Sequence, residues 1–172
     1  SLIIGGTASG KSHFGETLAR HSGQPRIYIA TAQAFDDEMR AKIAKHRADR
    51  GPDWITIEAP LDMPKHVINA PKGQTVFVDC LTLWLSNHLL AENPVDHLVN
   101  EFLDACENTD ANVIVITNEV GQSVVPENAL ARRFQNAQGQ INQSIAARAD
   151  LVVHVLAGIP MAISGNMPAG LP

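Results

Sequence analysis

The stretch Gly5-Gly6-Thr7-Ala8-Ser9-Gly10-Lys11-Ser12 fits the pattern G-x-x-x-x-G-K-[S/T] and directly follows the apolar pair Ile3-Ile4. In this context a buried strand ends, a glycine-rich turn exposes backbone N–H groups, and a helix begins with the positive end of its dipole facing the turn. Such a turn binds nucleotide phosphates. Lys11 is expected to reach the β- and γ-phosphate oxygens, and the Ser12 hydroxyl to contact Mg²⁺. We therefore expect the chain to bind a nucleoside triphosphate; the alternative is a glycine-rich turn without a ligand.

Short apolar runs alternate with longer helical patterns along the chain. Several runs, such as Val76-Phe77-Val78, are apolar at successive positions, which is typical of parallel strands covered on both faces. The expected strands are Leu2–Gly5, Arg26–Ala30, Trp54–Glu58, Thr75–Asp79, Asn112–Thr117 and Leu151–Leu156. The expected helices are Lys11–His21, Asp36–Arg50, Leu61–Ala70, Thr82–Ala91, Val95–Glu107 and Ala129–Ala149.

This alternation predicts an α/β protein with a doubly wound, mostly parallel central sheet and right-handed crossovers. Together with the phosphate loop it indicates a P-loop NTPase-type three-layer fold of the RecA-like kind. Ligands are then expected at the carboxyl ends of the strands. The tail from Gly165 to Pro172 is expected to be mobile or to extend an edge of the sheet.

The size and composition restrict the class of protein. A length of 172 residues predicts a single domain over 1–172. The net charge of −5 lacks the basic field of a general nucleic-acid binder, so we expect no nucleic-acid partner. Cys80 and Cys106 are the only cysteines and have no C-x-x-C spacing, which favours the reducing cytoplasm over a disulfide or zinc framework. We expect neither a membrane span nor a signal peptide.

Two carboxylates follow predicted strands. Asp79 ends an apolar run and resembles the acidic residue of a Walker B strand beside the phosphate loop, where it can hold Mg²⁺ directly or through water. The alternative is that Asp79 caps the next helix. Glu119 follows the next apolar strand and is expected to open onto the same edge, where it could orient substrate or activate a hydroxyl. Capping of the following loop is equally compatible with its spacing.

The predicted helix Asp36–Arg50 carries a basic stripe, because Lys42, His46 and Arg50 are spaced at i, i+4 and i+8, with Arg47 beside the histidine. Neighbouring cations favour the neutral form of an imidazole. A neutral imidazole can attack phosphorus, and the same cations can hold a triphosphate. The alternative is an ordinary solvated helix face.

The motifs together resemble one family, the bifunctional adenosylcobinamide kinase/adenosylcobinamide-phosphate guanylyltransferases of cobalamin biosynthesis. The matching segments, from Leu2 to about Ile163, are the phosphate loop, Ile29-Ala30-Thr31, Asp36-Asp37-Glu38-Met39, His46-Arg47 with Arg50, Trp54 with Glu58, Asp79-Cys80-Leu81-Thr82, Thr117-Asn118-Glu119-Val120-Gly121, Val125-Pro126-Glu127-Asn128, Ala131-Arg132 and Asn142-Gln143. No single segment beyond the phosphate loop is distinctive, but their order is specific. One departure is Ala8, where family members commonly carry arginine.

The resemblance implies two reactions with ATP, GTP and Mg²⁺ as cofactors. The first transfers a phosphoryl group from ATP or GTP to the hydroxyl of adenosylcobinamide. The second transfers GMP from GTP to adenosylcobinamide phosphate through a covalent intermediate on the histidine that corresponds to His46. The resemblance also implies a homotrimer. It further places Glu58 against guanine or ribose and Thr31 and Ala32 in the same pocket.

The catalytic residues are thus expected to be His46 and Lys11, with Ser12 and Asp79 at the metal and Glu119 near the substrate. The residues expected to contact nucleotide are Gly5, Gly6, Thr7, Ala8, Ser9, Gly10, Lys11, Ser12, Thr31, Ala32, Arg47, Arg50, Glu58 and Asp79. Two other functions share the phosphate loop: a small-molecule kinase with a different acceptor, and a non-catalytic nucleotide-dependent regulatory module.

Overall fold

The computed structural model of the protein describes residues 1–33, 37 and 51–171. The predicted helix Asp36–Arg50, and with it His46, Arg47 and Arg50, lies outside the described residues except at position 37.

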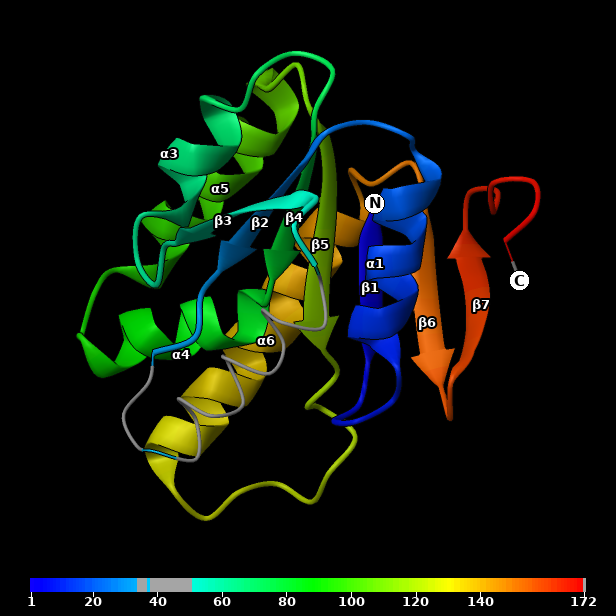
Figure 1. Ribbon diagram of the computed structural model, residues 1–172. Helices are drawn as coiled ribbons and strands as arrows, with labels where there is room; N and C mark the ends of the chain where they lie inside the picture. Colours follow the sequence, from blue (N-terminus) through cyan, green and yellow to red (C-terminus); the bar gives the residue numbers. More distant parts are fainter. Residues whose placement is uncertain (34–36, 38–50, 172) are drawn as a thin grey trace.

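A sheet in the order β3-β2-β4-β5-β1-β6-β7 forms the centre of the described chain (Figure 1). Its strands are β1 (Leu2–Gly5), β2 (Arg26–Ala30), β3 (Trp54–Glu58), β4 (Thr75–Asp79), β5 (Asn112–Asn118), β6 (Val152–Leu156) and β7 (Ile159–Ser164). Strands β1 to β6 pair in parallel, and β7 pairs with β6 in the antiparallel direction. The carboxyl ends of β1 to β6 therefore meet at one edge, the lower edge in Figure 1.

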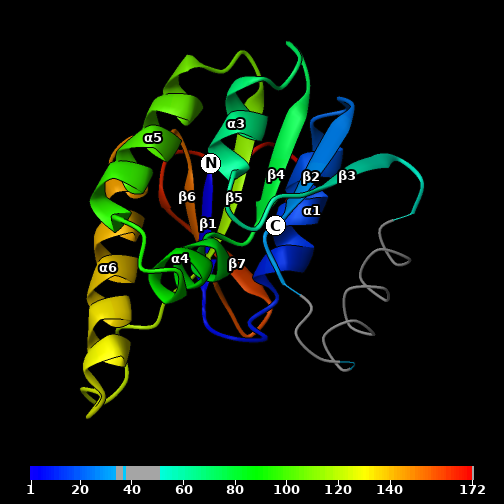
Figure 2. The same cartoon turned by 90° about the vertical axis from the view of Figure 1, so that its left-hand side faces the viewer.

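Helices cover both faces of this sheet (Figure 2). One face carries α3 (Met63–Ile68), α4 (Leu81–Leu90), α5 (Val95–Asn108) and α6 (Ala129–Ala146), and the other carries α1 (Lys11–His21). The strand residues alternate between the two cores, as in β4, where Val76 and Val78 face α3 to α6 while Phe77 faces α1. Burial on both faces explains why these strands read as continuous apolar runs.

Helix α1 approaches the sheet closely because it carries glycine where it crosses β4 and β5. A β-carbon at Gly15 would lie 2.6 Å from Cδ1 of Ile116 and 2.8 Å from the ring of Phe77. One helical turn before Gly15 is Lys11, and two residues beyond Phe77 is Asp79. These steps are about 6 Å along the helix and about 7 Å along the strand. They bring the start of α1 level with the end of β4.

The structure confirms the three-layer α/β fold with a mostly parallel sheet. The six predicted strands match β1 to β6, with end shifts of one residue at β5 and β6. The position of β5 between β1 and β4 agrees with the RecA-like description. Strand β7 was not predicted. It follows β6 through the turn Ala157-Gly158, whose residues both have positive φ, as in a two-residue hairpin loop.

The tail after β7 differs from the expectation of mobility or edge extension. Met167 and Leu171 are half-buried and pack against the core on the α1 face. Gly165 allows this return, because its φ is +76° and a β-carbon there would lie 2.0 Å from the carbonyl oxygen of Asp150.

Candidate functional site

The phosphate loop connects β1 to α1 at the carboxyl edge of the sheet. Gly10 occupies the position before the helix with φ +95°, in the left-handed region that glycine adopts without strain. Lys11 begins the helix, is only 9% exposed, and donates from Nζ to the carbonyl oxygen of Gly6 at 3.0 Å. The ammonium group therefore folds back over the loop whose N–H groups and helix dipole attract anions.

The β6–β7 hairpin supports the loop from the side. The N–H of Gly158 donates to the carbonyl oxygen of Ser9 at 2.8 Å. A β-carbon at Gly5 would lie 2.5 Å from the carbonyl oxygen of Val155, so the loop can pass β6 only as glycine. The Ser9 hydroxyl is buried and has no hydrogen-bond partner among the described residues. This hydroxyl can therefore donate to a phosphate oxygen, beside the backbone N–H groups of the phosphate loop.

Ala8 has φ 56° in the middle of the loop and is exposed. A non-glycine residue in this region is uncommon.

Asp79 ends β4, which β5 separates from the phosphate-loop strand β1. Strand β5 lies between β1 and β4, pairing Asn118 with Gly5 on one side and Ile116 with Asp79 on the other. Two strand spacings separate Gly5 from the level of Asp79, about 10 Å across the sheet. Asp79 still faces the α1 side, because it alternates with Val78 and follows Phe77 by two residues.

Hydrogen bonds fix the ends of β2 and β4. The hydroxyl of Tyr28 donates to Oδ2 of Asp79 at 2.7 Å. Thr31 is fully buried; its Oγ1 donates to the carbonyl oxygen of Cys80 at 2.7 Å and accepts from the Cys80 N–H at 2.8 Å. The Thr31 side chain thus braces the edge of the sheet instead of opening into a pocket as the resemblance implied. Ala32 beside it is half-buried.

Glu119 is placed against the phosphate loop by its backbone. Its N–H donates to the carbonyl oxygen of Gly5 at 3.2 Å, and its Oε1 accepts from the N–H of Gly121 at 2.6 Å. The carboxylate therefore caps the loop that follows β5, which was one of the two alternatives. It does so at the same edge of the sheet as the phosphate loop, so a contact with substrate stays a prediction.

A buried polar network behind Glu119 was not predicted. The Thr117 hydroxyl donates to Oδ1 of Asn142 at 2.7 Å, and Nε2 of Gln138 donates to both of these residues at 2.9 Å. Nδ2 of Asn142 donates to the carbonyl oxygen of Asn118 at 3.1 Å. The signal available in the sequence was the i, i+4 spacing of two amides within an otherwise apolar helix stripe.

Glu58 is exposed at the end of β3, opposite Ala30 of β2. Four strand spacings separate it from β1, about 19 Å along the same carboxyl edge. The structure thus brings the phosphate loop, Glu119 and Asp79 together and leaves Glu58 at the far end of the edge.

Burial, and after it the adjacent Asp79 carboxylate, raises the pKa of the Cys80 thiol to about 11. This thiol is therefore protonated at neutral pH and is no candidate nucleophile.

The oxygen groups at the site fit magnesium. Ser12 is the second residue of α1, and the half-buried carboxylate of Asp79 lies on the same face of the sheet. Among the described residues there is no cluster of three or more histidine, cysteine or acidic side chains that could enclose a metal. Magnesium commonly takes one or two protein oxygens and completes its shell with substrate phosphates and water.

Comparison with known proteins agrees with this geometry. The family model for cobinamide kinase / cobinamide phosphate guanyltransferase matches residues 1–163. The chain belongs to this family. Among curated relatives, it is 42% identical over 168 residues to the bifunctional adenosylcobalamin biosynthesis protein CobP of Pseudomonas aeruginosa, covering 96% of this chain and 97% of the relative.

Two further curated relatives also match. The bifunctional adenosylcobalamin biosynthesis proteins CobU of Escherichia coli and Salmonella typhimurium are 36% and 37% identical over 179 residues, each covering 94% of this chain and 98% of the relative. A solved structure of the RadB recombinase aligns with a TM-score of 0.48 at 17% identity over 89% of this chain and 72% of that one. The fold assignment rests on this chain's own strand order. No helix in the described residues has the length and apolar character needed to cross a membrane.

Proposed function

We propose that this protein phosphorylates adenosylcobinamide with ATP or GTP and then transfers GMP from GTP to adenosylcobinamide phosphate, giving adenosylcobinamide-GDP. The observation that carries the proposal is the phosphate loop with Lys11 folded over it, in a chain that matches a cobinamide kinase/guanyltransferase model over residues 1–163. The names of the curated relatives, bifunctional proteins of adenosylcobalamin biosynthesis, agree with it.

In the kinase step, the loop N–H groups and Lys11 hold the β- and γ-phosphates of the nucleotide. The substrate hydroxyl attacks the γ-phosphorus, the bond to the β–γ bridging oxygen breaks, and the nucleoside diphosphate leaves. Phosphoryl transfer of this kind depends on positioning and on stabilising charge. We assign the contact with the acceptor to Glu119, and the hydrogen bond from its backbone N–H to the carbonyl oxygen of Gly5 supports this assignment.

In the guanylyl step, a neutral imidazole nitrogen of His46 attacks the α-phosphorus of GTP and pyrophosphate leaves. An oxygen of adenosylcobinamide phosphate then attacks the same phosphorus, the P–N bond breaks, and His46 returns to its free form. Arg47 and Arg50 stabilise the charge on the phosphates, as their place in the basic stripe suggests. Glu58 and Ala32 contact the nucleoside, with Thr31 bracing the same edge of the sheet.

Magnesium, held by Ser12 and Asp79 directly or through water, would neutralise charge on the phosphates. We further propose a cytoplasmic homotrimer, on the basis of the resemblance to the family.

The experiment uses the full chain with GTP labelled on either the α- or the γ-phosphate. We expect an acid-labile, alkali-stable protein adduct from the α-label alone, lost in His46→Ala and much reduced in Lys11→Ala. An adduct of undiminished strength in His46→Ala would assign the nucleophile elsewhere. Transfer of γ-phosphate without any α-label adduct would instead favour a small-molecule kinase, and nucleotide binding without either transfer a regulatory module.

A further inference from the structure

Tyr28, the only tyrosine of the chain, directs its hydroxyl at a carboxylate that the proposed function assigns to the metal. The side chain is 4% exposed, and its O–H donates to Oδ2 of Asp79 at 2.7 Å. Hydrogen bonds from a hydroxyl to an ionised carboxylate are shorter and stronger than those between neutral groups. One oxygen of Asp79 thus already has a fixed partner before any ligand is present.

The tyrosine ring is held on two sides. Its centroid is 5.4 Å from that of Phe77, the residue opposite it in the β2–β4 register, and 6.0 Å from that of Trp54, which meets it edge to face. Trp54 and Phe77 also contact each other, at 5.7 Å. With three buried rings in mutual contact, the hydroxyl of Tyr28 has little freedom to leave Asp79.

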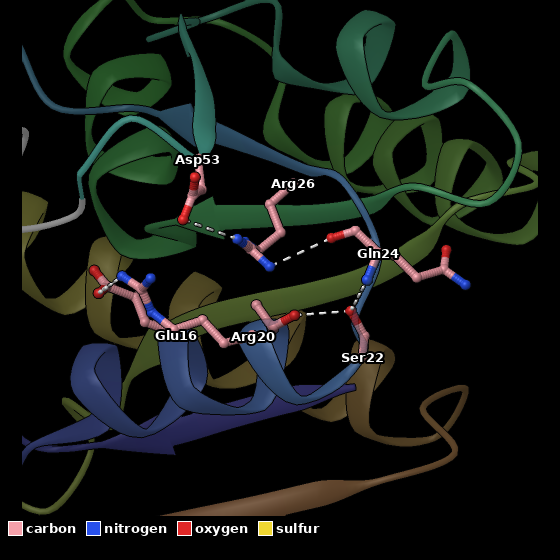
Figure 3. Close-up of polar contacts among 7 residues, drawn as sticks. Glu16, Arg20, Ser22, Gln24, Arg26 and Asp53 are labelled. Carbon is pink, nitrogen blue, oxygen red and sulfur yellow. Dashed lines mark hydrogen bonds and ion pairs between the residues drawn. The ribbon is translucent and has the colours of Figure 1, made fainter.

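Two arginines, Arg20 near the end of α1 and Arg26 at the start of β2, lie over Trp54 of this aromatic cluster, and Figure 3 shows their ion pairs with Glu16 and Asp53. The guanidinium groups of Arg20 and Arg26 lie 5.8 Å and 5.4 Å from the centroid of Trp54. Arg20 is paired with Glu16 at 3.9 Å, and Arg26 with Asp53 at 3.7 Å. The chain of contacts therefore runs from the opposite end of the sheet, through Trp54 and Tyr28, to the candidate site.

We propose that Tyr28 is a positioning residue that orients the Asp79 carboxylate: by occupying Oδ2 it leaves Oδ1 directed at the magnesium and phosphates of the bound nucleotide. The proposal rests on the proposed function, in which Asp79 contributes to the metal site. Asp79 is half-buried and level with Lys11 at the start of α1, so its carboxylate lies at the edge of the sheet where the phosphate loop is. Without the tyrosine hydroxyl, the carboxylate rotates and its oxygens exchange places. Loss of such an outer partner commonly costs about 10–100-fold in metal affinity or activity.

The test measures metal binding without catalysis. The full chain is saturated with a GTP analogue that carries a methylene bridge between its α- and β-phosphates, and Mn²⁺ is titrated while the free ion is followed by electron paramagnetic resonance. Four proteins are compared: the parent, Tyr28→Phe, Asp79→Asn and Phe77→Leu. Tyr28→Phe keeps the ring and removes only the hydroxyl. Phe77→Leu is the matched control, because it changes the packing on one side of the ring while Trp54 still contacts the other and the hydroxyl that bonds to Asp79 is kept.

We expect Tyr28→Phe to weaken Mn²⁺ binding about tenfold. Asp79→Asn should weaken it at least as much, Phe77→Leu should have little effect, and the affinity for the analogue without metal should stay the same in Tyr28→Phe. Parent-like Mn²⁺ affinity in Tyr28→Phe, with weakened binding in Asp79→Asn, overturns the role of Tyr28 and leaves Asp79 at the metal. Parent-like affinity in both variants refutes the assignment of Asp79 as well. An equal loss in Phe77→Leu and Tyr28→Phe would assign the effect to packing and also overturn the proposal.

Discussion

Asn142 of α6 ties that helix to the end of β5, and its replacement by alanine tests how the site edge is supported. The side chain is 6% exposed, its Oδ1 accepts hydrogen bonds from Thr117 and Gln138, and its Nδ2 donates to the carbonyl oxygen of Asn118. Alanine removes all three bonds and leaves the partner groups buried. At about 1 kcal/mol net for each hydrogen bond, the expected loss of unfolding free energy is about 3 kcal/mol.

The measurement is urea unfolding followed by far-ultraviolet circular dichroism, with the melting temperature from calorimetry. For a domain of this length, about 3 kcal/mol corresponds to a decrease in Tm of roughly 6–12 °C. Gln143→Ala is the matched control, because Gln143 is the next residue of the same helix and is exposed. It should change stability by no more than about 0.5 kcal/mol. If Asn142→Ala and Gln143→Ala lose the same small amount, the network does not stabilise the β5 end and the reasoning is refuted.

Three further predictions concern the loop, the tail and the pH dependence. Gly5→Ala should weaken GTP binding, because the added β-carbon would lie 2.5 Å from a backbone oxygen of β6. Calorimetric titration measures the affinity, and a parent-like value would contradict the description of the loop. Gly165→Ala should lower the unfolding free energy by about 2–4 kcal/mol through overpacking and left-handed strain. Gly73→Ala, with the similar φ of +77° and only an ordinary contact at 3.8 Å with the Gln24 side chain, should cost about 1 kcal/mol, and equal losses would refute the packing argument. Burial lowers the pKa of His88 in the folded protein below its ordinary value of 6.5. As the pH decreases below about 6.5, His88 therefore binds a proton more readily in the unfolded chain than in the folded protein, and the unfolding free energy should fall. His88→Gln should reduce this slope and His97→Gln, at an exposed position, should not; an identical slope in all three proteins would contradict it.

Elements whose local pattern is strong could be predicted from the sequence. The phosphate loop, α1 and the strands buried on both faces are determined by glycine placement and by apolar runs, and these agree with the structure. Strand β7 was missed because its burial is slight and Pro160 interrupts the pattern; a proline is tolerated there because β7 lies at the edge of the sheet. The pairing order of the individual strands was not predicted, since local pattern does not specify strand order.

Among the candidate site residues, those of the loop are placed as expected because consecutive residues fold together. The partners of Asp79 and Asn118 could not be predicted, since Tyr28 and Asn142 are 51 and 24 residues away in the chain and are joined to them by the fold alone. The buried position of Thr31 has the same origin. The roles of His46, Arg47 and Arg50 stay predictions, which rest on the basic stripe and on the family resemblance.

The most direct test of the account is a crystal structure of the protein with magnesium and the α,β-methylene analogue of GTP. The account predicts the triphosphate on the loop between β1 and α1, and an imidazole nitrogen of His46 about 3–3.5 Å from the α-phosphorus, in line with the leaving group. A His46 ring that faces solvent, far from the nucleotide in every subunit, would contradict the guanylyl-transfer mechanism.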